Sequence, residues 1–232
     1  FARGLGEDLG LFDVPLLGGD TTSTPGPLTV SITALGAPLG ARIPSRADAR
    51  VGEHVWVTGF IGDALLGLRA LGEAPELIGA QASDRSGAAD IVDAYRVPRP
   101  PVAFAAAIAT YASASTDVSD GLVADAANIA RASKVALSLH AEAVPLSSAG
   151  HAHALKYGAR GLAALVTGGD DYQVLFTAAP EQRGAIMAAA RAAAVNVALI
   201  GDVVEGDGVR ITTSDGVELE LGGLGHRHKL GR

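Results

Sequence analysis

The stretch DVSDGL at residues 117–122 lies at a junction between regular elements. Asp117, Ser119 and Asp120 stand close together, directly before the apolar spacing that predicts a helix over residues 121–133. Ser119 or Asp120 can cap this helix, and a helix N-terminus is a natural phosphate site. A cap needs only one such side chain. The cluster therefore indicates either a ligand site or an ordinary N-cap with spare surface acids.

The hydrophobic pattern predicts a mixed order of strands and helices. Strands are predicted at residues 14–17, 28–35, 54–58, 135–140, 172–177 and 195–204. Helices are predicted at residues 1–12, 63–71, 87–95, 101–110, 121–133 and 181–194, with shorter helical pieces over 147–166. The end of the chain is predicted to form a hairpin, with turn pairs at 207–208 and 215–216. This uneven grouping predicts an α+β fold rather than a doubly wound sheet.

Two further clusters combine a glycine pair with an acid. GGDTTS at residues 18–23 follows a predicted apolar strand, and GGDDY at residues 168–172 enters another. Glycine lacks a Cβ, so its backbone N–H can approach a bound phosphate closely. Asp20 and Asp170 would then present carboxylates beside that phosphate. Each segment alone is also typical of a tight turn or a loop.

Carboxylates gathered from three distant segments repel one another, by up to about 4 kcal/mol for a pair about 4 Å apart at an effective dielectric of about 20. Divalent cations relieve this repulsion by bridging carboxylate and phosphate oxygens. A site made of Asp rather than His or Cys selects a hard cation such as Mg²⁺. The implied chemistry is phosphoryl transfer. Arg46, in a predicted linker, is either a guanidinium fork for phosphate or ribose or a solvated surface arginine.

The composition argues against several classes of function. The net charge of −7 argues against binding through a basic surface, so no nucleic-acid partner is expected. No apolar run reaches the roughly 20 residues of a membrane-spanning helix, so no membrane partner is expected. Cysteine is absent, which excludes thiolate metal sites and fits a cytoplasmic location. The pairs His151/His153 and His226/His228 are expected in exposed loops or tails.

Five segments, in their order and spacing, resemble the thiamine-monophosphate kinase family. They are LGGDTT (17–22), VTG (57–59) with GD (62–63), RP (99–100), DVSDGL (117–122) and GGDDY (168–172). The resemblance covers essentially the whole chain and extends to a wider group that includes aminoimidazole-ribonucleotide synthetase. It implies a homodimer with a two-domain α+β fold, mixed or antiparallel sheets and helices packed on one face. Residues 1–40 would be the remnant of an N-terminal ATP-binding and dimerisation domain, and residues 41–232 the C-terminal α+β domain.

The resemblance also implies roles for individual residues. The implied sets are, for ATP, Gly19, Asp20, Arg46 and Ser119; for Mg²⁺, Asp20, Asp117 and Asp120; and for thiamine monophosphate, Asp170 and His226. Two of these depart from the family pattern. Asp170 stands where the family usually has Glu, and His226 stands where it usually has an aromatic ring. Both departures concern the expected contacts with the acceptor substrate.

The activity implied is in-line transfer of the ATP γ-phosphoryl group to the phosphate of thiamine monophosphate, giving thiamine diphosphate. The acceptor oxygen is already anionic near neutral pH, so no catalytic base is expected. Family members begin with a further N-terminal third that carries a Gly-Asp-Asp metal motif, and a polypeptide without it is expected to be inactive. Two alternatives stay open. One is a related ATP-using synthetase acting on another small molecule, and the other is a non-catalytic nucleotide-binding fragment.

Overall fold

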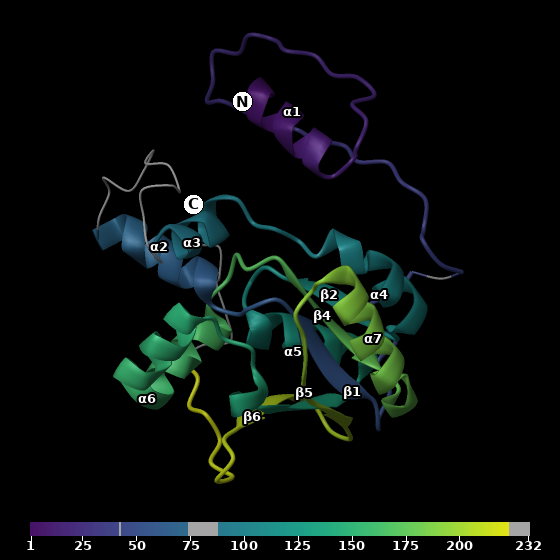
Figure 1. The fold of residues 1–232 in the computed structure, drawn as a ribbon, viewed down its shortest axis with the longest axis vertical. Coiled ribbons are helices and arrows are strands. Elements are labelled where there is room, and N and C mark those ends of the chain that lie inside the picture. Colours follow the sequence, from purple (N-terminus) through teal and green to yellow (C-terminus); the bar gives the residue numbers. More distant parts are fainter. Residues whose placement is uncertain (42, 74–87, 223–232) are drawn as a thin grey trace. The chain divides into compact units, whose positions relative to one another are not determined.

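A computed structural model describes residues 1–41, 43–73 and 88–222 of the 232-residue chain. The chain divides into two compact units, residues 1–37 and residues 38–232. Figure 1 shows the elements of each unit. The acidic clusters fall on both units: residues 18–23 on the first, and residues 117–122 and 168–172 on the second.

The first unit contains one helix, α1 (Ala2–Leu11), as the apolar spacing predicts. The strands predicted at residues 14–17 and 28–35 are wrong, because both segments are irregular in the described structure. Their apolar side chains are exposed, among them Leu17 at 79% and Leu28 at 89%. A strand is stable only beside a partner strand, and the described part of this unit contains none. The alternating pattern was present in the sequence, but the pairing it requires is absent from this unit.

The second unit is built on one mixed sheet whose strand order is β2-β4-β1-β5-β3-β6. The strands are β1 (His54–Thr58), β2 (Ser115–Val118), β3 (Ala136–His140), β4 (Gln173–Ala178), β5 (Val197–Val204) and β6 (Gly208–Thr212). All neighbouring pairs are antiparallel except β3 with β6, which is parallel. The predicted α+β class and the mixed, largely antiparallel sheet are therefore confirmed.

Helices cover both faces of this sheet. They are α2 (Asp63–Glu73), α3 (Ala88–Arg96), α4 (Ala105–Tyr111), α5 (Leu122–Ser133), α6 (Ser148–Thr167) and α7 (Arg183–Ala193), with short 3₁₀ turns at Val102–Phe104, Ala141–Ala143 and Pro180–Gln182. In Figure 1, α4 and α7 lie together, and α2, α3 and α6 lie together. The layer that contains α2, α3 and α6 fits the expectation of helices on one face. The smaller layer of α4 and α7 is an addition that the expectation did not include.

The two layers follow from alternation along the central strands. Val55 and Val57 of β1 join the apolar cluster formed with α5 and α6, whereas Trp56 joins the cluster formed with α4 and α7. Leu175 and Phe176 of β4 divide between the clusters in the same way. Successive side chains of a strand point to opposite faces. Both faces at the centre of the sheet are therefore apolar and need cover.

Two details of the sheet differ from the sequence prediction. β2 was not predicted, because a four-residue strand with the sequence STDV carries almost no apolar signal. The predicted terminal hairpin is correct only at residues 215–216, where Thr212 pairs with Glu218 and Thr213 N–H donates to the Val217 carbonyl at 2.9 Å. At residues 207–208 the chain turns, but β6 pairs with β3 instead of β5. A turn signal does not determine which strand becomes the neighbour.

Candidate active site

The two acidic loops of the second unit lie side by side. One loop follows edge strand β2 and the other precedes β4, its antiparallel neighbour. The main-chain N–H of Tyr172 donates to the Val118 carbonyl at 2.8 Å, and the N–H of Asp170 donates to the Ser119 carbonyl at 2.9 Å. These two bonds continue the β2–β4 ladder beyond the strands. DVSDGL and GGDDY, about fifty residues apart in the sequence, thus form one structure.

Glycines allow the loops to approach this closely. A Cβ on Gly169 would lie 2.4 Å from the carbonyl oxygen of Ser119, so no larger residue fits without moving a loop. Gly121 has φ +115°, and a Cβ there would lie 2.8 Å from the main chain of Thr167. Positive φ strains any residue with a side chain. Gly169, one of the glycines that the sequence suggested as phosphate contacts, therefore has a first role in packing loop against loop, and Gly121 shares this role.

The cap of helix α5 differs from the sequence prediction. Gly121 is the N-cap residue and no side chain caps the helix, so the expected caps Ser119 and Asp120 are wrong. Instead, the carboxylate of Asp125 reaches back and accepts the N–H of Ser119 at 2.9 Å and that of Asp120 at 3.0 Å. Asp125 is 1% exposed. It fixes the main chain of the loop, and this leaves the side chains of Ser119 and Asp120 available for a ligand.

Asp171 fixes the second loop in a similar way. It is 6% exposed, and its carboxylate accepts the N–H of Gly62 at 2.8 Å and the N–H of Ala64 at 3.3 Å, at the start of α2. Burial raises the pKa of Asp171 to about 7, against the lowering effect of those two hydrogen bonds. Its neighbours Asp170 and Tyr172 both have positive φ, 68° and 49°. Such conformations in non-glycine residues cluster at functional sites.

The electrostatics indicate that the carboxylates share one neighbourhood. The pKa of the Tyr172 hydroxyl is raised, first by partial burial, then by Asp170, with further contributions from Asp117 and Asp120. The pKa of Asp125 is raised mainly by burial, and the charges of Asp120 and Asp117 add to that rise. Three carboxylates of the two loops therefore lie within electrostatic reach of Tyr172. The Asp120 carboxylate accepts no hydrogen bond from another described residue.

Arg46 provides a cation beside these acids. Its Nε donates to Thr116 Oγ1 at 2.9 Å, and its Nη2 lies 3.6 Å from Asp117 Oδ1. The main chain is held as well, because Ser133 Oγ donates to the Arg46 carbonyl at 2.8 Å. Arg46 and Asp117 are both about half exposed. Arg46 is therefore held at the edge of the site by contacts that a freely solvated surface arginine lacks.

The remaining expected site residues lie elsewhere. Gly19 and Asp20 belong to the first unit, where Asp20 Oδ1 accepts the N–H of Thr21 at 2.8 Å. Their participation in the site stays a prediction. His226, and the pair His226/His228 with it, lie outside the described residues. The other pair, His151 and His153, lies on α6 and not in a loop, because the apolar spacing of residues 147–166 continues through it.

The donor set fits a magnesium ion that is shared with phosphate. Asp117 and Asp120 offer hard carboxylate oxygens, and their mutual repulsion favours a cation. Across the described residues there is no group of three or more His, Asp or Glu side chains that would hold a metal alone. Mg²⁺ usually takes only one or two carboxylates and completes its shell with phosphate oxygens and water. Two carboxylates beside a phosphate site are therefore sufficient.

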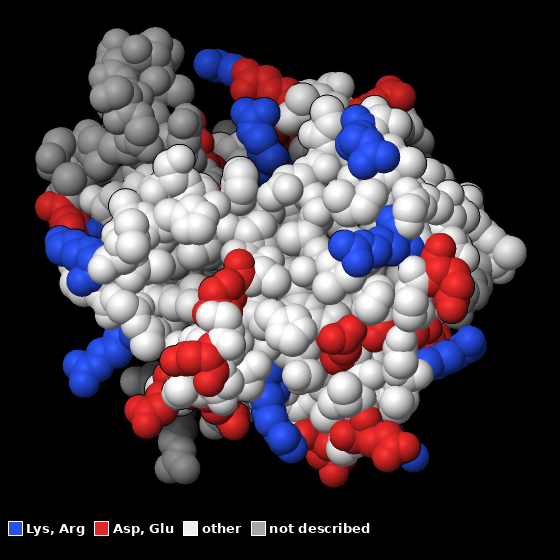
Figure 2. Space-filling model, turned by 60° about the horizontal axis from the view of Figure 1, so that its bottom comes forward, with Lys and Arg blue, Asp and Glu red and all other residues white. Residues whose placement is uncertain are grey.

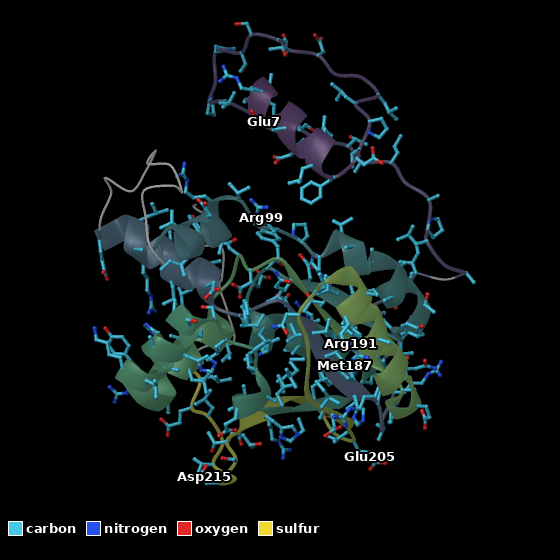
Figure 3. The ribbon with its side chains drawn as sticks, viewed as in Figure 1. Glu7, Arg99, Met187, Arg191, Glu205 and Asp215 are labelled. Atoms are coloured by element: carbon cyan, nitrogen blue, oxygen red, sulfur yellow. The ribbon has the colours of Figure 1, made fainter. Side chains whose placement is uncertain are left out.

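A cavity of about 490 Å³ lies next to the buried carboxylate of Asp171. Its lining includes Phe60, Asp63, Asp93 and Arg99; Arg99 is labelled in Figure 3.

Sequence reasoning missed the structural roles of Asp125 and Asp171. The available signals were an acid one turn into a predicted helix and the second acid of the DD pair.

Comparison with known proteins assigns the chain to a class. The family described as "AIR synthase related protein, C-terminal domain" matches residues 50–214, and the chain belongs to this family. Among solved structures, the hydrogenase maturation protein HypE of Escherichia coli has a TM-score of 0.57 at 22% identity, a likeness of fold alone, and covers 82% of this chain and 55% of that one.

Closer likenesses are to thiamine-monophosphate kinases, which confirms the resemblance inferred from the motifs. The chain is 43% identical over 90% of its length to the thiamine-monophosphate kinase of Caulobacter vibrioides and 31% identical over 91% to that of Salmonella typhimurium. It spans 57% and 65% of the length of these relatives. The crystal structure of the Stenotrophomonas maltophilia enzyme is 32% identical with a TM-score of 0.66, covering 72% of this chain and 52% of that chain. The structure named "AaThiL complexed with AMPPCP and TMP" is also 32% identical, with a TM-score of 0.64, covering 81% and 55%.

Proposed function

We propose that the chain forms part of an ATP-dependent kinase that converts thiamine monophosphate to thiamine diphosphate. The observation that carries this proposal is the main-chain pairing of the two acidic loops, which gathers Asp117, Asp120 and Asp170 at one edge of the sheet. The relatives named thiamine-monophosphate kinase support the reaction. The relative complexed with AMPPCP and TMP supports ATP and thiamine monophosphate as the two substrates.

Both substrates carry negatively charged phosphate groups that repel each other, so the chief task of the protein is to bring these groups together. Arg46 would bind a phosphate or the ribose of ATP through its planar guanidinium group. Ser119 would contact ATP from the loop that Asp125 holds in place, and Gly19 would do so through its main chain. Asp170 and His226 would orient the acceptor. The acceptor oxygen is already anionic, so these residues position it without removing a proton.

Mg²⁺ would be held by Asp20, Asp117 and Asp120. When bound, it supplies neutralisation of the charge between carboxylates and phosphates. The Asp117–Arg46 contact at 3.6 Å offsets part of the negative charge at the same edge of the site. Asp117 thus has a cation on one side, whereas the Asp120 carboxylate has no described partner. We therefore expect the loss of Asp120 to lower turnover more than the loss of Asp117.

We also infer the domain roles and the assembly. Residues 1–40 would belong to an ATP-binding and dimerisation domain, and residues 41–232 would form the α+β domain that carries the paired loops. The exposed apolar side chains of the first unit, including Leu16, Leu28 and Ile32, support a homodimer in which they are covered. In the described residues no helix has the length and apolarity needed to cross a bilayer. The absence of cysteine supports a reducing compartment, the cytoplasm, as the location.

The test is formation of thiamine diphosphate from ATP and thiamine monophosphate at limiting Mg²⁺, with Asp120→Asn compared with wild type. The loss of a metal-binding carboxylate should lower turnover by about 100-fold or more. Asp207→Asn, the same chemical change at an exposed turn residue, is the control and should retain full activity. Near wild-type turnover in Asp120→Asn would contradict the metal assignment.

Two measurements on the same protein distinguish the proposed kinase from the two alternatives. Calorimetry with ATP and Mg²⁺ that shows binding, together with no product, would favour a non-catalytic nucleotide-binding fragment. ATP consumption that depends on a different small-molecule acceptor would favour a related synthetase. The proposed kinase activity would be supported by both results together: binding of ATP and formation of thiamine diphosphate.

A further inference from the structure

A second cavity, of about 590 Å³, lies between α2, α3 and α6 and shares no lining residue with the paired acidic loops. Its volume falls in the range of about 300–1,000 Å³ that is typical of small-molecule sites. Its floor is apolar and is made of small or aliphatic side chains: Leu66, Ala70, Ile91, Ala149, Ala152 and Ala164. A lining of this kind favours contact with an apolar group of a ligand.

The walls of this cavity are basic. Arg69 of α2 and Lys156 and Arg160 of α6 line it, together with His153, against the single acid Glu73. No ion pair joins Arg69, Lys156 or Arg160 to another residue in the part of the chain that the structure describes. The pKa of His153 is lowered, first by burial and then by the charges of Arg69 and Lys156. Arg69 and Lys156, from two different helices, therefore both lie within electrostatic reach of His153, in a chain whose net charge is −7.

A break in helix α6 lies between Lys156 and Arg160, two of the basic residues that line the cavity. Gly158 has φ 59° and ψ −143° inside the helix, a conformation that favours glycine. Gly161 packs against the preceding helical piece so tightly that a Cβ would lie 2.9 Å from the His153 carbonyl oxygen. The Tyr157 ring lies 4.7 Å from the His153 ring, and the Lys156 amine lies 5.0 Å from the centre of the Tyr157 ring. His153, Lys156 and Tyr157 all precede the break, and their helical spacing places the aromatic ring beside the cation.

We propose that this cavity binds a small phosphate monoester that carries an apolar ring. The guanidinium groups of Arg69 and Arg160 offer forked donors of the shape that phosphate accepts, and Lys156 adds a third positive charge. The ring of the ligand packs on the alanine-rich floor. The dianion would place negative charge beside three cations that have no ion-pair partner in the described part of the chain. The site is separate from the proposed kinase site, because the two share no residue.

The probe is phenyl phosphate, titrated by calorimetry into the whole chain, with inorganic phosphate and phenol as the two halves of the same ligand. Removal of two forked cations in the double variant Arg69→Gln/Arg160→Gln should weaken phenyl phosphate binding by about ten-fold or more. The matched control is Arg183→Gln/Arg191→Gln on α7, which removes the same charge outside the cavity; Arg191 is labelled in Figure 3. The control should bind as wild type does.

Lys156→Gln, a single change at an exposed residue, gives an independent readout and should also weaken phenyl phosphate binding. Wild type should bind phenyl phosphate more tightly than either half-ligand. Three results would overturn the proposal: no binding of phenyl phosphate to wild type, inorganic phosphate binding as tightly as phenyl phosphate, or equal loss of affinity in the α7 control. The last would mean that only net charge attracts the anion.

Discussion

Asp171→Asn tests how the structure holds the loop that carries Asp170. The Asp171 carboxylate accepts two main-chain N–H bonds at the start of α2, but it is buried, and burial raises its pKa from 3.8 to about 7. Between these two pH values the folded protein keeps a proton on Asp171 that the unfolded chain has released. The stability that this proton provides is complete below the lower value and is lost as the pH rises through the upper one.

The magnitude follows from the size of the shift. Each pH unit inside the window changes the free energy of unfolding by about 1.4 kcal/mol, so from about pH 5 to about pH 8 Asp171 should remove about 2 to 3 kcal/mol. The amide that replaces this carboxyl group cannot titrate and resembles the protonated acid, since one of its two polar atoms carries hydrogen. The free energy of unfolding of wild type minus that of Asp171→Asn should therefore fall by that amount across the interval.

Urea unfolding, followed by circular dichroism at several pH values, measures this difference. Asp207→Asn makes the same chemical change at an exposed turn residue, and its difference from wild type should not depend on pH. A wild-type minus Asp171→Asn difference that stays constant would refute the reasoning. A difference that rises with pH would refute it more strongly, because the N–H bonds from Gly62 and Ala64 would then outweigh burial.

Three further predictions concern other contacts. Gly169→Ala should separate the paired loops and reduce kinase turnover by about ten-fold or more, whereas Gly184→Ala, which has open space around it, should leave turnover unchanged. Glu53→Ala should lower the free energy of unfolding by about 2 to 4 kcal/mol in urea denaturation, because Glu53 is 5% exposed and accepts hydrogen bonds from Ser113, Thr177 and a main-chain N–H. Arg46→Lys should raise the KM for ATP by about ten-fold in steady-state assays, since lysine lacks the planar fork; an unchanged KM would place ATP elsewhere.

Much of the fold was predictable because its central strands carry a strong apolar signal. β1 and β4 were predicted from runs of valine, leucine and aromatic residues, and α5 from regular apolar spacing after Gly121. β2 was missed because a four-residue edge strand with three polar residues owes its form to pairing with β4. The parallel pairing of β6 with β3 was missed for a related reason, since local turn chemistry does not determine a distant partner.

The candidate site was predictable in its chemistry and less so in its construction. The sequence indicates that DVSDGL and GGDDY present acids beside glycines, and the structure joins these segments through main-chain bonds. It does not indicate that Asp125 and Asp171 turn inward to hold main-chain N–H groups, whereas the Asp120 carboxylate accepts no hydrogen bond from another described residue. Neighbouring aspartates look alike in a sequence, and only burial separates an acid that supports a loop from an acid that faces a ligand. Figure 2 shows that acidic and basic side chains are interspersed over the face it presents.

The hydrogen bonds that join the two acidic loops run between main-chain atoms, from Tyr172 to Val118 and from Asp170 to Ser119. A scaffold of this kind depends on the glycines between the loops and on the carboxylates of Asp125 and Asp171, whereas the side chains of Asp117, Asp120 and Asp170 take no part in these bonds. The chemistry of this edge can therefore change without a change of fold. Asp117, Asp120 and Asp170 can be exchanged one at a time while the spacing of these positions is preserved. Single substitutions of these acids can therefore change which ligand this edge would contact, while the sheet beneath stays the same.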